Sequence, residues 1–158
     1  PLHRAASRGS PENIQTLLAA GADVMARTKT GRTPLHYAAV SNTTASVQIL
    51  LTAGADAMAR GGNGWTPLHW ASSGGSYLNI ETLLAAGANV MARGGDDWTP
   101  LHWAASSGTS DNIEVLLAAG ADAKAKSKDG KTPWDLAQEN EEAEGTKGYW
   151  ALNDAQYN

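Results

Sequence analysis

Hydrophobic residues return in a helical pattern at four places along the chain. In each place an Ile or Val is followed three and four residues later by two Leu residues. That spacing puts the three side chains on one face of an α-helix. The four sets are Ile14/Leu17/Leu18, Val47/Leu50/Leu51, Ile80/Leu83/Leu84 and Ile113/Leu116/Leu117. A glycine follows each set, where a residue that ends a helix belongs (Gly21, Gly54, Gly87 and Gly120). The pattern predicts four amphipathic helices.

A shorter, Ala-rich helix is predicted before each amphipathic one. It starts at a Thr-Pro pair, because Thr caps a helix N-terminus and Pro suits the first helical position. The capping threonines are Thr33, Thr66, Thr99 and Thr132. The threonines form a column, that is, a set of residues that recur at the same position of each unit. A second column, of hydroxyl residues, is expected to cap the amphipathic helices, at Ser10, Thr43, Ser76 and Thr109.

The helix pairs are separated by polar, Gly-rich segments at a constant period. "PLH" occurs at residues 1, 34, 67 and 100, and a degenerate "PWD" at 133, so each step is 33 residues. The segments predict hairpin loops with tips near 28–31, 61–64, 94–97 and 127–130. A residue with positive φ is expected at each tip, supplied by Gly31, Gly64 and Gly130 and by Asp97 in one copy.

These motifs together resemble the ankyrin repeat. The family's unit opens its first helix with G-x-T-P-L-H-x-A-A and closes its second with L-L-x-x-G-A-D. Here the pattern reads "GRTPLHYAA" with "LLTAGAD", "GWTPLHWAS" with "LLAAGAN", and "DWTPLHWAA" with "LLAAGAD", and it covers residues 1 to about 137. The resemblance implies an all-α fold: an α-solenoid of stacked helix pairs, with projecting β-hairpin loops that border a concave groove.

The units and the departures from the family pattern define one domain over residues 1–158. We expect a partial unit at 1–27, units at 28–60, 61–93 and 94–126, and a divergent C-terminal cap at 127–158. The family's usual Asp at the start of each hairpin is missing, and Thr28, Gly61, Gly94 and Ser127 stand there. In the last unit, "GYWALNDAQY" predicts a closing helix whose apolar residues cover the repeat before it, with Tyr149 and Leu152 on the Leu116/Leu117 layer.

Composition narrows the function classes. The 158 residues carry a net charge of −4, from 12 basic and 16 acidic side chains, which argues against a nucleic-acid binder because such proteins need a basic face. The chain has no cysteine, so disulfides and thiolate metal sites are excluded. No apolar run approaches the roughly 20 residues of a membrane span. We expect a soluble monomer without membrane contact, with a cytoplasmic location favoured; the chain opens mid-repeat, so a leader removed from it is compatible with the sequence.

The histidines are expected to be structural rather than catalytic or metal-binding. His3, His36, His69 and His102 recur once per unit, and stacked helices lie about 8–10 Å apart, so they cannot share one metal ion. The family resemblance implies that this His bonds to the Thr side chain and nearby backbone. Serines lie near His69 and His102, but no G-x-S-x-G turn and no phosphate-loop Lys-Ser/Thr accompanies them. We therefore predict no enzyme activity, no metal and no cofactor.

Tryptophan and arginine columns are the strongest binding candidates. Trp65 and Trp98 stand just before Thr-Pro, and Trp70 and Trp103 just after the His. The resemblance implies that these positions line the hairpins and the concave side of the first helices. Arg60 and Trp65 flank one hairpin tip, and Arg93 and Trp98 the next, so we expect each pair to face each other across its hairpin. The predicted partner-binding residues are Arg27, Arg60, Trp65, Trp70, Arg93, Trp98, Trp103 and Lys126.

Three functions fit this pattern. Trp and Arg dominate many protein–protein interfaces, so the first is a non-enzymatic protein–protein interaction module with a Trp/Arg-lined groove, its partner being a protein segment of acidic or aromatic character. The second is a binder of a glycan or of single-stranded nucleic acid that stacks on the Trp ladder. The third is a pure scaffold segment of a longer chain, in which Arg–Trp stacks only stiffen the hairpins.

Overall fold

The computed structural model describes residues 1–41 and 43–157, and these residues form five short first helices, four second helices and a closing helix. The first helices are α1 (Leu2–Ser7), α3 (Pro34–Ala39), α5 (Pro67–Gly74), α7 (Pro100–Ser107) and α9 (Pro133–Ala137). The second helices are α2 (Pro11–Ala19), α4 (Thr44–Thr52), α6 (Tyr77–Ala85) and α8 (Ser110–Ala118), and the closing helix is α10 (Lys147–Ala155). The Thr and Ser columns stand at the N-cap positions where the sequence placed them.

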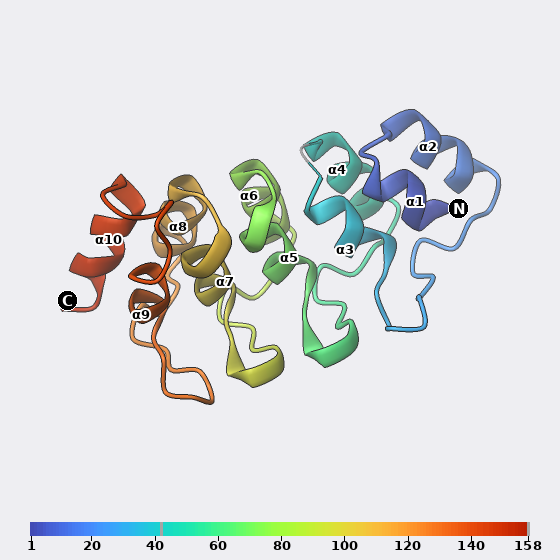
Figure 1. Ribbon diagram of the computed structural model, residues 1–158. Helices are drawn as coiled ribbons and strands as arrows, with labels where there is room; N and C mark the ends of the chain where they lie inside the picture. Colours follow the sequence, from blue (N-terminus) through green and yellow to red (C-terminus); the bar gives the residue numbers. More distant parts are fainter. Residues whose placement is uncertain (42, 158) are drawn as a thin grey trace.

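The helices stack into two parallel layers (Figure 1). First helices contact first helices along the chain, second helices contact second helices, and α10 packs on α8 and α9. The loops between units project from one side of this stack. The predicted all-α solenoid is therefore confirmed.

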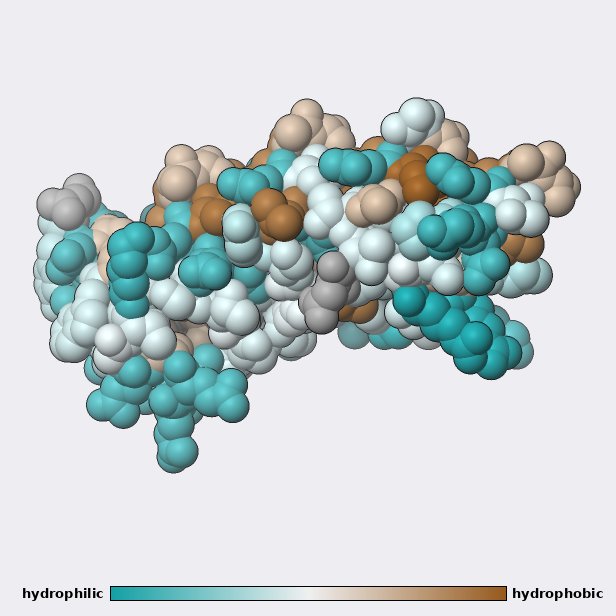
Figure 2. Space-filling model, turned by 90° about the horizontal axis from the view of Figure 1, so that it is seen from above, coloured by the Kyte–Doolittle hydropathy of each residue, from teal (hydrophilic) through white to brown (hydrophobic). Residues whose placement is uncertain are grey.

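The apolar stripe forms the core between the layers. Ile14, Val47, Ile80 and Ile113 are fully buried, and the Leu residues beside them are buried or half-buried. Each unit has only its neighbours against which to bury this face. Some hydrophobic residues still reach the surface in a row along one long edge, while hydrophilic side chains protrude from the opposite edge at both ends (Figure 2).

The projecting loops are hairpin-shaped without being β-ladders, because no strand is assigned within residues 1–41 and 43–157. A backbone hydrogen bond joins the two ends of each loop, such as Gly61 N–H to the Trp65 carbonyl at 2.9 Å and Gly94 N–H to the Trp98 carbonyl at 2.9 Å. The expected positive φ angles occur at Gly31, Gly64, Gly130 and Asp97.

Two loop tips contain a feature that the sequence analysis did not predict. Asn63 and Asp96 also have positive φ, of 62° and 57°, inside the 3₁₀ turns η1 (Gly62–Gly64) and η2 (Gly95–Asp97). Each tip thus has two successive left-handed residues, as in a type I′ turn. Asn and Asp tolerate this backbone better than most residues because their short polar side chains bond locally.

The closing helix packs on α8 and α9 through the face that carries Leu152 and Tyr149. Leu152 is fully buried, and the Tyr149 ring lies 4.6 Å from the Trp134 ring between centroids. Trp150 and Tyr157 are 55% and 79% exposed, so these two aromatic residues do not help to cover the last repeat. The helical period explains the difference, since Tyr149 and Leu152 are three residues apart while Trp150 points away.

Candidate binding site

The histidine column links each unit to the next. The Nδ1 atoms of His36, His69 and His102 accept the backbone N–H of Thr33, Thr66 and Thr99 at 3.0–3.1 Å. A backbone N–H can only donate, so Nδ1 carries no proton and Nε2 does. Each Nε2–H then donates to a carbonyl 29 residues further on, on Trp65, Trp98 and Lys131. One neutral ring caps its own helix and holds the following hairpin.

Burial keeps these rings neutral. It lowers the pKa of His69 to about 4, opposed by hydrogen bonds to the Trp98 and Ala92 backbone, and burial likewise lowers the pKa of His36 and His102. In the last unit Asp135 takes the histidine's place, and its carboxylate accepts both the N–H and the hydroxyl of Thr132. These bonds lower the pKa of Asp135. Both nitrogens of each central ring are therefore occupied by the scaffold.

The arginine column binds backbone carbonyls. Arg27, Arg60 and Arg93 each donate from the guanidinium group to the carbonyl 33 residues further on, belonging to Arg60, Arg93 and Lys126. Arg27 and Arg93 also reach across their own hairpins to the carbonyls of Gly31 and Asp97. These side chains tie neighbouring hairpins together while remaining exposed.

The tryptophans before Thr-Pro pack on other aromatic rings rather than on these arginines, and Trp65 also reaches the following unit. The Trp65 ring lies over Gly94, at the start of the next hairpin, and contacts the rings of His69 and Trp103. Trp98 contacts His102 and Trp103. The expected Arg60–Trp65 and Arg93–Trp98 pairs are thus replaced by contacts to other partners, because the carbonyls hold the guanidinium groups. Arg32 makes a cation–π contact with Trp70 instead, at 4.5 Å from Cζ to the ring centroid.

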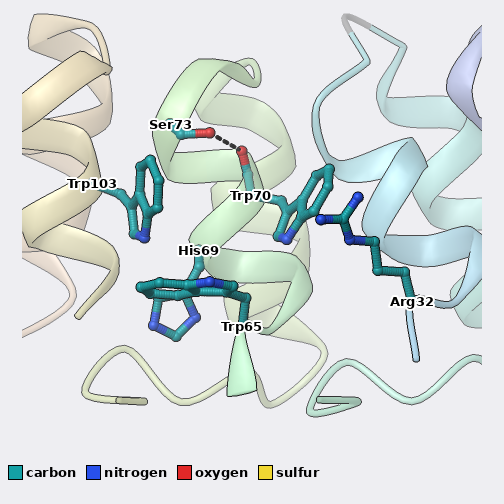
Figure 3. Close-up of a pocket in the computed structure, with 6 residues that line it drawn as sticks. All are labelled: Arg32, Trp65, His69, Trp70, Ser73 and Trp103. Atoms are coloured by element: carbon teal, nitrogen blue, oxygen red, sulfur yellow. Dashed lines mark hydrogen bonds between the residues drawn. The ribbon is translucent and has the colours of Figure 1, made fainter. Parts of the chain in front are cut away.

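A pocket opens between the first helices of the third and fourth units. It encloses about 220 Å³ and is lined by Arg32, Trp65, His69, Trp70, Ser73 and Trp103. Figure 3 shows Trp70 and Trp103 as its two walls, with Trp65 and His69 at one end and Ser73 at the other. Trp103 leans on Trp65 and Trp98, at 5.2 and 5.1 Å between centroids, which leaves the space beside Trp70 open.

One wall holds an unusual polar atom. The Trp103 Nε1 is buried without a hydrogen-bond partner among the residues that the structure describes. In Figure 3 the nitrogen end of this indole points toward the Trp65 ring, which lies nearly perpendicular to it at 80°. An N–H directed at an aromatic face gains a weak interaction, which helps to hold Trp103 away from Trp70.

Comparison with known families agrees with this architecture. Family models described as "Ankyrin repeats (3 copies)" and "Ankyrin repeats (many copies)" match residues 2–94 and 83–137. The chain belongs to the ankyrin repeat family. A search of curated proteins gave no significant match. Ankyrin repeats are generally protein–protein interaction modules and are typically non-enzymatic.

The ankyrin scaffold brings together only part of the predicted site. Trp65, Trp70 and Trp103 line the pocket. Trp98 packs behind Trp103, and Arg27, Arg60, Arg93 and Lys126 lie along the hairpins, where three of them donate to carbonyls and the fourth supplies one. Among residues 1–41 and 43–157, no three His, Asp or Glu side chains group as a metal site would require, and none of the helices there is long and apolar enough to cross a bilayer.

Three pocket residues, Arg32, His69 and Ser73, are absent from the predicted partner-binding set, and Arg32 is the one of them that carries a charge. Arg32 occupies the repeat position that Trp65 and Trp98 fill in later units. This replacement of Trp by Arg is visible in the sequence and could have indicated a distinct role for Arg32. A Cβ at Gly61 would come within 3.2 Å of Arg32 Cγ, so the stem of this side chain passes close to the next hairpin before its head reaches Trp70.

Proposed function

We propose that this ankyrin repeat domain binds another protein through the pocket between Trp70 and Trp103. The observation that carries the proposal is the pocket itself: three tryptophans from two adjacent units surround an open space next to a cation. Tryptophan and arginine are the residue types that most often dominate protein–protein binding. The rings are fixed by ring contacts and by the stacked helices, so little conformational entropy is lost when a partner binds.

The surrounding hairpins act as a frame for this site. Their cross-links through the arginine and histidine columns fix the spacing between units, and therefore the width of the pocket. Arg27, Arg60, Arg93 and Lys126 are exposed along these hairpins and are proposed to form the polar rim of the interface.

A protein side chain fits the geometry better than a row of nucleic-acid bases. Binding of single strands by stacking needs successive open ring faces. Here Tyr37 lies against Trp70, and Trp98 lies against Trp103, so the ladder offers one slot rather than a series. A glycan remains the alternative ligand that the same experiment detects.

The test compares variants in capture from a native extract. The wild-type domain is expected to retain a partner that the Trp70→Ala/Trp103→Ala variant loses. Trp150→Ala is the matched control, because this Trp lies on α10 outside the pocket and is 55% exposed. The captured molecule is then purified and its direct binding measured by calorimetry. Equal binding by the double variant would place the interface elsewhere on the domain.

A further inference from the structure

Arg32 is the hairpin arginine whose guanidinium group makes no hydrogen bond or ion pair within residues 1–41 and 43–157; in Figure 3 it lies against Trp70, on the side away from Trp103. The guanidinium groups of Arg27, Arg60 and Arg93 donate to carbonyls. In the described part of the chain, the salt bridges join Lys131 to Glu139 and Lys147 to Glu114, and the side-chain contact found for Arg32 is the Trp70 ring. Its planar fork of N–H donors is therefore available to a ligand, and it matches a carboxylate in geometry.

The charge around the pocket has one sign on the Arg32 side. Residues 24–55 carry Arg27, Lys29 and Arg32 and no Asp or Glu. Of the six residues that line the pocket, Arg32 is the charged one at neutral pH, because burial lowers the pKa of His69 to about 4. An aromatic pocket with a carboxylate would attract a cation; this pocket has a cation instead, which favours an anionic partner.

The walls of the pocket define the second requirement. Trp70 and Trp103 occupy equivalent positions on α5 and α7, and adjacent helices pack about 8–10 Å apart. An aromatic ring that enters the space between them can contact the indole rings, and aromatic rings attract one another in such arrangements. The volume of about 220 Å³ matches one large side chain, and Figure 3 shows both walls open to the same space.

We infer that the partner of this pocket is a protein segment that inserts an aromatic side chain between Trp70 and Trp103 and pairs a neighbouring carboxylate with Arg32. The inference rests on the proposed function and names the chemistry of the partner. Binding involves no covalent step. The carboxylate would take a bidentate position on the guanidinium group, while Trp70 keeps that group in place from its other side.

The test uses four short peptides that are acetylated and amidated to remove terminal charges. Each has a central residue between two identical neighbours: Gly-Asp-Trp-Asp-Gly, Gly-Ser-Trp-Ser-Gly, Gly-Lys-Trp-Lys-Gly and Gly-Asp-Leu-Asp-Gly. Binding to the ¹⁵N-labelled domain is followed through the indole N–H signals of its six tryptophans. The Asp-Trp-Asp peptide should shift the Trp70 and Trp103 signals and bind about tenfold tighter than the Ser-Trp-Ser peptide, since a good charge-assisted pair is worth about one factor of ten.

Variants of the domain distinguish the contribution of the Arg32 charge to binding from that of the space between Trp70 and Trp103. Arg32→Gln should remove the preference for the acidic peptide and leave the Ser-Trp-Ser peptide unchanged. Lys29→Gln is the matched control, because it removes the same charge from the same hairpin at an exposed residue outside the pocket. Thermal melting of both variants shows whether the fold is kept.

Each outcome decides the inference. Equal binding of acidic and neutral Trp peptides, tighter binding of the Lys peptide, equal binding of the Leu peptide, or no shift with any peptide would overturn it. The capture experiment with Trp70→Ala/Trp103→Ala remains independent of these results. Loss of capture in that variant without any preference for the acidic peptide would keep the groove as the interface and discard only the acidic, aromatic partner.

Discussion

The indole of Trp65 occupies the space that a side chain at Gly94 would need. A Cβ built on Gly94 comes within 2.1 Å of Trp65 Cε3 and 2.4 Å of Cζ3. Gly94 stands where the ankyrin pattern usually has Asp, so the missing Asp has a physical reason in this unit: the ring of the preceding hairpin packs flat against the backbone. Gly94 itself has φ of −101°, so its backbone does not require glycine, and the requirement comes from the ring alone.

Gly94→Ala is therefore expected to displace Trp65 and disturb the end of the pocket that it forms. The overpacking should lower the free energy of unfolding by about 1–3 kcal/mol. The near-ultraviolet circular dichroism spectrum should also change, because Trp65 loses its contact with the Trp103 ring. Gly74→Ala is the control, because a Cβ there meets no atom of the described residues within 4 Å. A Gly94→Ala domain with unchanged stability and spectrum would show that Trp65 does not pack as described.

The histidine column makes stability depend on pH in a defined direction. Burial lowers the pKa of His36, His69 and His102 from 6.5, and that of His69 to about 4. Between these two pH values the histidines of the unfolded chain bind protons, while the buried histidines of the folded chain stay neutral. The free energy of unfolding therefore falls as the pH is lowered from 6.5 toward 4. His69 alone should contribute a loss of about 3 kcal/mol across it; above pH 6.5 its contribution is complete.

Urea unfolding between pH 7.5 and 5 measures this loss, because most carboxylates remain ionised there. His69→Asn should show a shallower dependence than the wild type over the same range. A wild-type unfolding free energy that stays constant from pH 7.5 to 5 would contradict the assignment of these rings as buried and neutral.

The same histidine should matter for stability without binding a metal. His69→Ala leaves the Thr66 N–H and the Trp98 carbonyl without their partner, which should cost about 1–3 kcal/mol. Calorimetric titration of the wild type with Zn²⁺ should show no stoichiometric tight site, since both ring nitrogens are occupied. One zinc bound per molecule and abolished by the substitution would refute the structural role.

The sequence predicted the scaffold well because repeated local rules determine it. Thr-Pro pairs, the apolar stripe and the glycines at helix ends each act within one unit, and the helices, caps and tips appeared where these residues placed them. The contacts between units were harder to predict from the sequence. The direction of Arg60 depends on an acceptor carbonyl at Arg93, and the direction of Trp65 on the absence of a side chain at Gly94. Spacing within one hairpin does not contain that information.

Contacts between units also involve the methionines that replace a common Asn of the family. The sulfur of Met25, Met58 and Met91 accepts the backbone N–H of Asp56, Asn89 and Asp122, 31 residues further on. Sulfur is a weak acceptor, and the sequence departure alone did not indicate this link. The pocket could not be predicted for the same reason. Its shape depends on a contact between units, in which Trp103 leans on Trp65 and away from Trp70.

The closing helix gives the last prediction, because it covers the end of the stack through very few side chains. Leu152 is fully buried, and the Lys147 ammonium group pairs with Glu114 on α8. Leu152→Ala should cost about 2–5 kcal/mol, from lost transfer free energy and from the cavity that it leaves. Trp150→Ala, two residues away and 55% exposed, should change stability by no more than about 0.5 kcal/mol.

Deleting residues 146–158 should have a larger effect than either substitution, because it exposes the Leu116/Leu117 layer. The melting temperature should fall, and the domain should associate through that face. Thermal melting and light scattering of the three variants measure these effects. A deletion that melts like the wild type and stays monomeric would mean that α8 needs no cover and that the fourth unit ends the solenoid unaided.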